Sequence, residues 1–301
     1  RKPSSSRSDV DNSQAPLAEP EPADAEPAKT SKAGRNLPAA IGVGVLLGVV
    51  ALTCLFVQPW LFVALACVAI CIGIWEVTNA FANSGIRIAR TPLYLGAIAC
   101  SAATYQWGVV AQLVTFGSMV VFILMWRIRR GVDGYVKDIT ASVFTAAYLP
   151  FMVGFVMLTL DHADGPQRII VFISLTIAND IGGYAAGVMF GKHPIAPGVS
   201  PKKSWEGFAG SVIFQAAIGA WLFVWLLDGY WWQGVIAGIV MSIVATAGDF
   251  AESAIKRDLG VKDMSKLLPG HGGLMDRLDS LIPNAFVSWA LFYFFLGSGI
   301  S

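Results

Sequence analysis

The sequence predicts an all-α polytopic integral membrane protein with about nine transmembrane helices and a cytoplasm-facing polar cavity in its C-terminal half. Composition gives two of the reasons, because 55% of the 301 residues are hydrophobic and only 14% are charged. Soluble domains carry about 25% charged residues, so this deficit excludes a soluble enzyme of the same size. The third reason is a succession of apolar runs of about 18 residues or more, which are long enough to cross a hydrocarbon core of about 30 Å.

Residues 1–36 differ in composition from the rest of the chain. They are rich in Ser, Pro, Ala, Asp and Glu and show no apolar period. Such a segment cannot bury enough apolar surface to offset the entropy lost on ordering. We therefore expect a disordered cytoplasmic tail. It does not resemble a signal peptide, because no short apolar core with a cleavage site follows a basic start.

The apolar runs that follow predict nine spans. The first two are separated only by Gln58 and Pro59, which predicts a tight helical hairpin. The run over 92–126 is too long for one helix, and we expect it to turn at the polar group 104–106, which is Thr104, Tyr105 and Gln106. The predicted spans are 38–57, 60–81, 92–107, 109–126, 141–160, 168–190, 207–227, 231–250 and 281–298.

The placement of Lys and Arg predicts the orientation. Cytoplasmic loops of membrane proteins carry an excess of these residues. With nine spans and the N-terminus inside, every Lys and Arg except Arg168 falls on the cytoplasmic side, whereas a wrong count would scatter them. We therefore expect a multi-pass plasma-membrane protein whose two long polar segments, 191–206 and 251–280, face the cytoplasm. Long polar loops on a rigid scaffold are where function usually lies.

Two pairs of carboxylates flank the second polar segment. Asp249 and Glu252 lie three residues apart near the end of the eighth span, and Asp276 and Asp279 have the same spacing before the ninth. Each pair therefore shares a helical face. Ionisable groups at membrane depth are costly and usually face a polar cavity or a partner. Carboxylates without nitrogen or sulfur ligands nearby suit a hard cation such as Mg²⁺.

Cations and a glycine-rich turn lie between the two pairs. Positive charge beside clustered carboxylates is what a site for a triphosphate and a metal ion requires. The glycines permit close backbone approach, and successive N–H groups in such a turn can cradle an anion. For a single lysine, snorkelling at the membrane interface explains the position equally well. The residues are Lys256, Arg257, Lys262, Lys266, Gly270, His271, Gly272, Gly273 and Arg277.

The first polar segment follows a span that contains one carboxylate, Asp180. Three small residues beside it, Gly182, Gly183 and Gly187, favour close helix packing. Lys202 and Lys203 follow a proline-rich bend and suit either anionic lipid head groups or a substrate phosphate, which the residues alone do not separate.

Several other functions are not supported by the sequence. The four cysteines lie in apolar runs without a CxxC pair, so neither a disulfide framework nor a zinc site is predicted. There is no GxxxxGK[ST] loop and no HExxH motif. Nucleic-acid binding is also not expected, because basic and aromatic residues do not alternate on a soluble surface.

The motifs resemble a known family. Residues 253–279 contain SAIKR, then KD, then LPGHGGLMDRLD, which is similar to the signature of the phosphatidate cytidylyltransferases, also called CDP-diacylglycerol synthases. Asp180 with FGK at 190–192 and SPKKSWEG at 200–207 resembles that family's second recurrent block. The resemblance covers about residues 170–298. It departs from the family's pattern after Asp180, where Ile181, Gly182 and Gly183 precede Tyr184.

The resemblance implies a reaction and a set of roles. CTP and phosphatidic acid would give CDP-diacylglycerol and pyrophosphate with Mg²⁺, a second cation being left open, in a membrane homodimer. It makes residues 37–160 N-terminal transmembrane helices and residues 161–301 a catalytic domain. Asp249 and Asp276 would bind the metal. The catalytic set would be Asp249, Asp276, Lys256, Arg257, Arg277 and Asp279, and the substrate-binding set Lys202, Lys203, Ser204, Asp180, Lys192, Ser253, Lys262, His271, Gly272 and Gly273.

Two other classes of function stay open at this point. A lipid kinase or an ether-lipid cytidylyltransferase would present a similar site, because only the acceptor or the transferred phosphate differs. A transporter is less favoured, because the sequence shows no internal repeat of broken helices and its polar cluster is confined to the C-terminal third.

Overall fold

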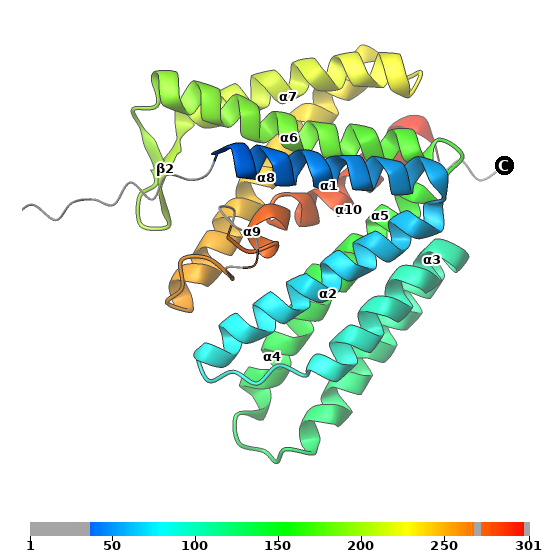
Figure 1. Cartoon of the computed structure of the whole chain (residues 1–301), viewed down its shortest axis with the longest axis vertical. Helices are drawn as coiled ribbons and strands as arrows, with labels where there is room; N and C mark the ends of the chain where they lie inside the picture. Colours follow the sequence, from blue (N-terminus) through cyan, green and yellow to red (C-terminus); the bar gives the residue numbers. More distant parts are fainter. Residues whose placement is uncertain (1–36, 266, 268–271, 298–301) are drawn as a thin grey trace, which may run out of the picture. The chain divides into compact units, whose positions relative to one another are not determined.

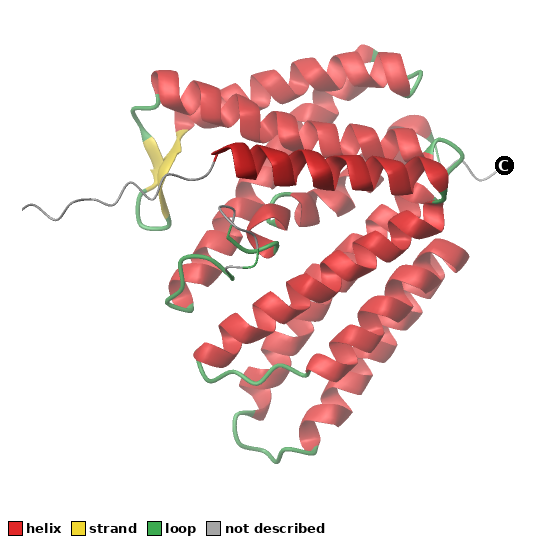
Figure 2. Cartoon of the chain, viewed as in Figure 1, coloured by secondary structure: helices red, strands yellow, loops and turns green. Residues whose placement is uncertain are grey.

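The computed structural model describes residues 37–265, 267 and 272–297, and the predicted tail over 1–36 lies outside them. The described chain is helical apart from one two-stranded hairpin (Figure 1, Figure 2). The elements are α1 Leu37–Val57, α2 Pro59–Asn83, α3 Arg90–Ile128, α4 Tyr135–Ala146, the π-helical turn η1 Ala147–Phe151, α5 Met152–Leu160, α6 Gly165–Phe190, β1 Pro194–Ala196, β2 Ser200–Ser204, α7 Trp205–Leu226, α8 Trp231–Asp258, α9 Met275–Leu278 and α10 Leu281–Leu296.

Seven helical segments of the described chain are long and apolar enough to cross a membrane. Two of them combine several of the elements above, since α4, η1 and α5 form one segment and α9 and α10 another. Large apolar side chains such as Leu113, Val188 and Phe294 are exposed on them, as expected for surfaces that contact lipid. The protein is therefore a multi-pass membrane protein. The segments are Pro59–Asn83, Arg90–Ile128, Tyr135–Leu160, Gly165–Phe190, Trp205–Leu226, Trp231–Asp258 and Met275–Leu296.

Helix α3 contains a sharp break at Gly108, whose φ of 71° and ψ of −158° are not helical. A Cβ atom on Gly96 would overlap the side chain of Met119, although a straight helix would separate these residues by about 34 Å. The two parts of α3 therefore fold back on each other. The predicted turn over 104–106 was wrong, because these residues are helical and the reversal uses the positive φ that glycine tolerates.

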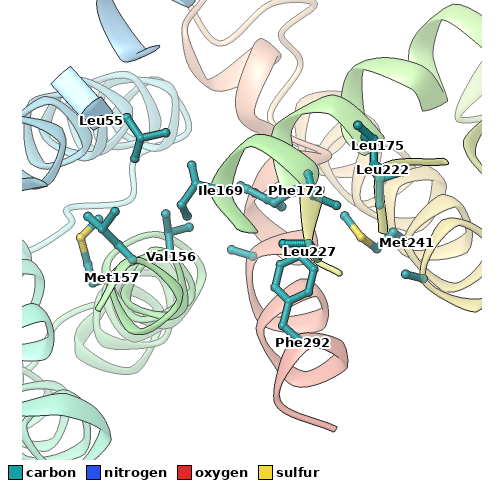
Figure 3. Packing of buried hydrophobic residues seen from close by; sticks show 14 of the residues in the cluster. Leu55, Val156, Met157, Ile169, Phe172, Leu175, Leu222, Leu227, Met241 and Phe292 are labelled. Atoms are coloured by element: carbon teal, nitrogen blue, oxygen red, sulfur yellow. The ribbon is translucent and has the colours of Figure 1, made fainter. Parts of the chain in front are cut away.

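Two clusters of buried apolar side chains hold the helices together. One joins α1, α2 and α5 to α6, α7, α8 and α10, and includes Leu55, Met157, Leu175, Met241 and Phe292 (Figure 3). The other joins α2, α3, α4 and η1 to α9 and includes Ile74, Leu93, Ile123, Leu149 and Met275. Because lipid tails are as apolar as these side chains, close packing rather than the hydrophobic effect stabilises such contacts within a bilayer.

Glycines let α6, α7 and α8 approach closely. A Cβ on Gly182 of α6 would lie 2.7 Å from the carbonyl oxygen of Gly210 in α7, and one on Gly183 would lie 2.5 Å from the Ser211 Oγ. The predicted packing role of these two glycines is confirmed. Gly187 makes an ordinary contact, with 3.8 Å to the Gly207 Cα. The close packing brings Asp180, which lies two residues before Gly182, next to α7.

The two-stranded hairpin is a departure from the all-α prediction. Strand β1 pairs antiparallel with β2, with Pro194 opposite Ser204 and Ala196 opposite Ser200, at one end of α6 and α7 (Figure 1). The Ser204 Oγ accepts a hydrogen bond of 3.1 Å from the Gly207 N–H, so it caps the N-terminus of α7. The proline-rich segment thus holds Lys202 and Lys203 on a strand rather than in a loose loop.

Candidate active site

A polar cavity of about 370 Å³ lies among α6, β2, α7, α8 and α9. Charged side chains of both signs line it, which distinguishes it from a lipid-filled groove. It collects residues that are far apart in the sequence. Of the predicted site residues it contains Asp180, Lys202, Lys203, Ser204, Asp249 and Arg277.

The Lys203 ammonium forms an ion pair with the Asp249 carboxylate in this cavity. The side chain of Lys203 is 30% exposed and that of Asp249 is 19% exposed, so both remain accessible. The ammonium also lies 5.0 Å from the centre of the Phe250 ring, which favours a cation on that side. The pair therefore joins β2 to α8 without closing the cavity.

Asp180 is oriented by a chain of hydrogen bonds within the helices. The Asn179 Nδ2 donates to the Asp180 Oδ1 over 3.5 Å, and the Asn179 Oδ1 accepts from the Ser242 Oγ over 2.9 Å. The Ser211 Oγ donates to the Asn179 carbonyl over 2.7 Å. Because Ser211 and Ser242 belong to α7 and α8, three helices fix the backbone and side chain beside Asp180.

A second, basic cavity of about 240 Å³ adjoins the first. Lys202 lines both cavities, so they share one wall. The basic cavity is formed by β2, the end of α8 and the segment after it. Its predicted site residues are Lys202, Ser253, Lys256, Arg257 and Lys262, and Asp263 also lines it.

The carboxylate of Asp276 lies outside the linings of both cavities. Its Oδ1 accepts a hydrogen bond of 2.8 Å from the Lys256 ammonium, and its Oδ2 accepts from the Gly273 and Met264 N–H groups over 2.8 and 3.1 Å. Lys256 also forms an ion pair of 2.9 Å with Glu252, which is fully buried. Asp276 thus connects the glycine-rich turn to the end of α8.

Asp279 lies where α8 and the start of α10 touch. A Cβ on Gly248 would lie 2.6 Å from the Asp279 carbonyl oxygen, so the chain before α10 approaches the backbone of α8 next to Asp249. The Asp279 Oδ1 accepts from the Ser280 N–H over 2.8 Å. This contact places the backbone of Asp279 beside the end of α8 that carries Asp249.

The described part of the glycine-rich turn binds carboxylates of the protein itself. Gly272 has a φ of 82°, and a Cβ on it would lie 3.1 Å from the Asp276 Oδ2. Gly273 would meet the same oxygen at 3.0 Å and both carboxylate oxygens of Glu76 at 3.0 Å. His271, predicted as a phosphate contact, lies outside the described residues. Lys192 lines neither cavity, and its backbone N–H donates to Glu206 over 3.1 Å.

Glu76 in α2 is the residue of this region that sequence reasoning missed. It is fully buried and accepts hydrogen bonds from the segment that leads to Asp276. A signal was present, because Glu76 is the one charged residue within Pro59–Asn83, and a lone ionisable group in a membrane span indicates a specific partner.

The carboxylates are compatible with a bound Mg²⁺. Mg²⁺ is usually held by one or two carboxylates together with water and substrate phosphates. Within the described residues no group of three or more His, Cys, Asp or Glu side chains is assembled for a metal. Both predicted ligands, Asp249 and Asp276, nevertheless accept a lysine ammonium, so each presents an oxygen to a cation. Each carboxylate suits Mg²⁺, whose other ligands would come from water and a substrate, whereas one ion held by both stays a prediction, because Asp249 lines the polar cavity and Asp276 does not.

A further cavity, of about 770 Å³, lies elsewhere and has no charged lining. It is formed by one face of α2 and part of α3, and Leu267 lies at its edge. Its lining offers no cation for a phosphate and no carboxylate for a metal, so the two smaller cavities are the candidate site.

Comparison with known proteins identifies the family. The profile of the cytidylyltransferase family matches residues 38–295. The chain is 39% identical over 278 residues to a phosphatidate cytidylyltransferase of Mycobacterium leprae, covering 87% of this chain and 89% of the relative. It is 40% identical over 274 residues to that of Mycobacterium bovis, covering 87% and 90%. A match of 38% over 152 residues to that of Helicobacter pylori covers 49% and 57%. The chain therefore belongs to the cytidylyltransferase family.

Proposed function

We propose that the protein transfers the cytidylyl group of CTP to phosphatidic acid and releases pyrophosphate. The observation that carries this proposal is the accessible Lys203–Asp249 pair in a polar cavity that shares Lys202 with a basic cavity. Two adjoining sites for phosphates are what a reaction between two phosphate-bearing substrates needs. The mycobacterial relatives named phosphatidate cytidylyltransferase support the choice of substrates.

The reaction requires charge neutralisation more than proton transfer. A phosphate oxygen of the lipid attacks the α-phosphorus of CTP, and the bond from that phosphorus to the oxygen bridging the β-phosphate breaks. The bonding electrons leave with pyrophosphate. The lipid phosphate is already ionised at neutral pH and needs no general base. The protein therefore accelerates the step by aligning two polyanions and stabilising the charge on them.

The chain supplies cations on both sides of this reaction. In our proposal, Lys203 and Arg277 neutralise a phosphate in the polar cavity, and Arg257 and Lys262 neutralise the polyphosphate in the basic cavity. Lys202 contacts both substrates. When bound, Mg²⁺ would supply Lewis-acid stabilisation of the negative charge on the phosphates. Asp249 and Asp276 would hold it, and Lys203 and Lys256 would then be free to bind phosphate instead of carboxylate.

The arrangement in the membrane is part of the proposal. We infer nine crossings: the seven long segments, with α3 counted as two crossings because it breaks at Gly108, and α1 as one more. The N-terminus and both cavities face the cytoplasm of the plasma membrane, residues 1–36 form a tail, and residues 37–160 and 161–301 form the N-terminal and catalytic regions. The homodimer implied by the resemblance stays a prediction, and the mass of the purified protein in detergent would test it.

A labelled-substrate assay tests the proposed reaction directly. Purified protein is incubated with phosphatidic acid and with CTP labelled at either the α- or the γ-phosphate, with and without Mg²⁺. We expect label in the lipid from the α-phosphate and a requirement for Mg²⁺. Label from the γ-phosphate would instead show a lipid kinase, and transfer only to an ether-lipid acceptor would show a different cytidylyltransferase. Absence of any transfer would refute the proposal.

A further inference from the structure

Glu76 is the deepest buried carboxylate that the proposed reaction does not use. Its exposed fraction is 0%, and it lies on α2, in the N-terminal region whose sequence is otherwise generic for a membrane helix. The Glu76 Oε1 accepts hydrogen bonds from the Ser265 Oγ over 2.5 Å and from the Leu274 N–H over 2.8 Å. The Glu76 Oε2 accepts from the Met275 N–H over 2.6 Å. These contacts join positions 189 to 199 residues apart.

The contacts lie at the point where α9 begins. The first N–H groups of a helix have no partner within the helix and must be satisfied from outside. Here Glu76 accepts from the two N–H groups, those of Leu274 and Met275, that directly precede Asp276 and Arg277. Asp276 contacts Lys256, and Arg277 lines the polar cavity. A shift of this backbone would therefore move two charged side chains of the site together.

Asp276 holds the same turn from its other end. Its Oδ2 accepts from the Gly273 N–H, while the next two N–H groups along the chain donate to Glu76. A Cβ on Gly273 would lie 3.0 Å from carboxylate oxygens of both residues. Of three consecutive backbone N–H groups, the first thus donates to a carboxylate of the candidate site and the next two donate to a carboxylate of a distant helix.

A buried carboxylate at position 76 costs folding free energy, and it matches the donors around it. Burying an ionised group costs several kcal/mol unless hydrogen bonds satisfy it. An apolar side chain at position 76 would avoid that cost, but it would leave three donors without this acceptor, and the buried one, the Met275 N–H, would cost about 1–3 kcal/mol. Only a group with acceptors on both of its terminal atoms satisfies all three at once.

We propose that Glu76 is a positioning residue of the active site, which sets the backbone of residues 273–275 so that Asp276 and Arg277 are correctly placed. The N-terminal transmembrane region then contributes to the active site as well as to the bundle. The inference about turnover rests on the proposed function. The inference about the backbone does not, because it is measurable without substrates.

The substitution Glu76→Gln separates positioning from packing. Glutamine has nearly the same shape and volume, so a residue that only fills space would tolerate it. Its amide, however, replaces one acceptor oxygen by an NH₂ donor. If the NH₂ takes the place of Oε2 it faces the Met275 N–H, and if it takes the place of Oε1 it faces the Leu274 N–H. Either orientation leaves one buried backbone donor without an acceptor.

Two measurements follow for Glu76→Gln. Without substrates, amide hydrogen exchange in peptides covering 273–275 should accelerate, because one donor has lost its acceptor. With CTP and phosphatidic acid, kcat should fall about 10- to 100-fold, the loss typical when a supporting contact of a metal or catalytic group is removed. The KM for phosphatidic acid should change by a smaller factor than kcat, because Arg277 is displaced while Lys202 and Lys203 keep their places in the polar cavity.

A second variant and a control keep the test decisive. Ser265→Ala removes one donor from Glu76 and leaves α2 intact, so it should shift exchange and kcat in the same direction by a smaller factor. Gly117→Ala places a Cβ where nothing lies within 4 Å, so it should leave exchange over 273–275 unchanged. Wild-type exchange and wild-type kcat in both Glu76→Gln and Ser265→Ala would overturn the proposal. A wild-type protein that transfers no cytidylyl group would refute the proposed function alone.

Discussion

The pair Arg127–Asp138 and the pair Lys203–Asp249 are both ion pairs, but they lie in opposite environments. In the first, the side chains are 4% and 5% exposed and the Nε–Oδ2 distance is 2.7 Å. In the second, the side chains are 30% and 19% exposed and line a cavity. The comparison teaches that burial of the pair, rather than its presence, separates a structural contact from a candidate site.

The closed pair has no capacity left for a ligand. The two terminal nitrogens of Arg127 donate to the carbonyl oxygens of Gly131 and Asp133 over 2.8 and 2.6 Å. The second oxygen of Asp138 accepts from the Arg87 N–H over 2.8 Å. The open pair differs, because Lys203 and Asp249 line a cavity, and in the proposed mechanism Lys203 exchanges the carboxylate for a phosphate. The proposed mechanism depends on this exchange of a carboxylate for a phosphate at the lysine ammonium.

Breaking the closed pair should give the largest effect on stability. Asp138→Asn would leave the buried Arg127 guanidinium without its counter-charge, which costs about 3–5 kcal/mol. Thermal unfolding of the purified protein in detergent would measure the loss. The kcat of the fraction that remains folded should equal that of the wild type. A folded variant with impaired kcat would contradict the division between closed and open pairs.

Breaking the open pair should give the largest effect on catalysis. We expect Asp249→Asn to lower kcat/KM about 10²- to 10³-fold, the range found when a group that stabilises developing charge is removed. Its unfolding temperature should change little, because partly exposed pairs contribute about 1 kcal/mol or less.

The matched variant Lys203→Gln breaks the same pair from its other side. It should raise the KM for a phosphate-bearing substrate, whereas Asp249→Asn should lower kcat and alter the Mg²⁺ response. Identical kinetic changes in the two variants would mean that only the pair, and not the separate groups, matters.

Titration with Mg²⁺ compares the carboxylates of the candidate site. Asp276→Asn should raise the Mg²⁺ concentration needed for half-maximal activity about 10- to 100-fold. Asp180→Asn alters a carboxylate in the cavity of Asp249. It should raise this Mg²⁺ concentration by a smaller factor, because the resemblance assigns Asp180 to substrate binding. The reverse order would assign Asp180, in place of Asp276, to the metal.

The sequence predicted the members of the site better than their contacts. Asp180, Lys203, Asp249 and Arg277 were all expected, and the structure brings them into one cavity. That Lys203 pairs with Asp249, across 46 positions, was not predictable. Such pairings depend on how far each helix is tilted and rotated, and packing sets these quantities rather than the length of an apolar run.

Local signals succeeded only where local chemistry decides the outcome. Gly182 was predicted to allow close packing, because a missing side chain has this effect whichever helix lies opposite. The turn in 92–126 was placed at polar residues, but Gly108 makes it, because a positive φ decides where a helix reverses. Glu76 was passed over because its partners lie nearly 200 positions away. One charge in an apolar helix was the available clue.

The smallest predicted effect concerns how tightly the helices around the site are packed. In Gly182→Ala the new Cβ would lie 2.7 Å from the Gly210 carbonyl oxygen and from the Phe214 Cβ, so α6 and α7 must separate. Overpacking of this kind costs about 1–3 kcal/mol. Gly117→Ala is the matched control, since nothing lies within 4 Å of its Cβ. The unfolding temperature should therefore be lower than that of the wild type for Gly182→Ala and unchanged for Gly117→Ala. Equal unfolding temperatures would mean that α6 can move away from α7 freely, and the fixed position inferred here for Asp180 would lose its basis.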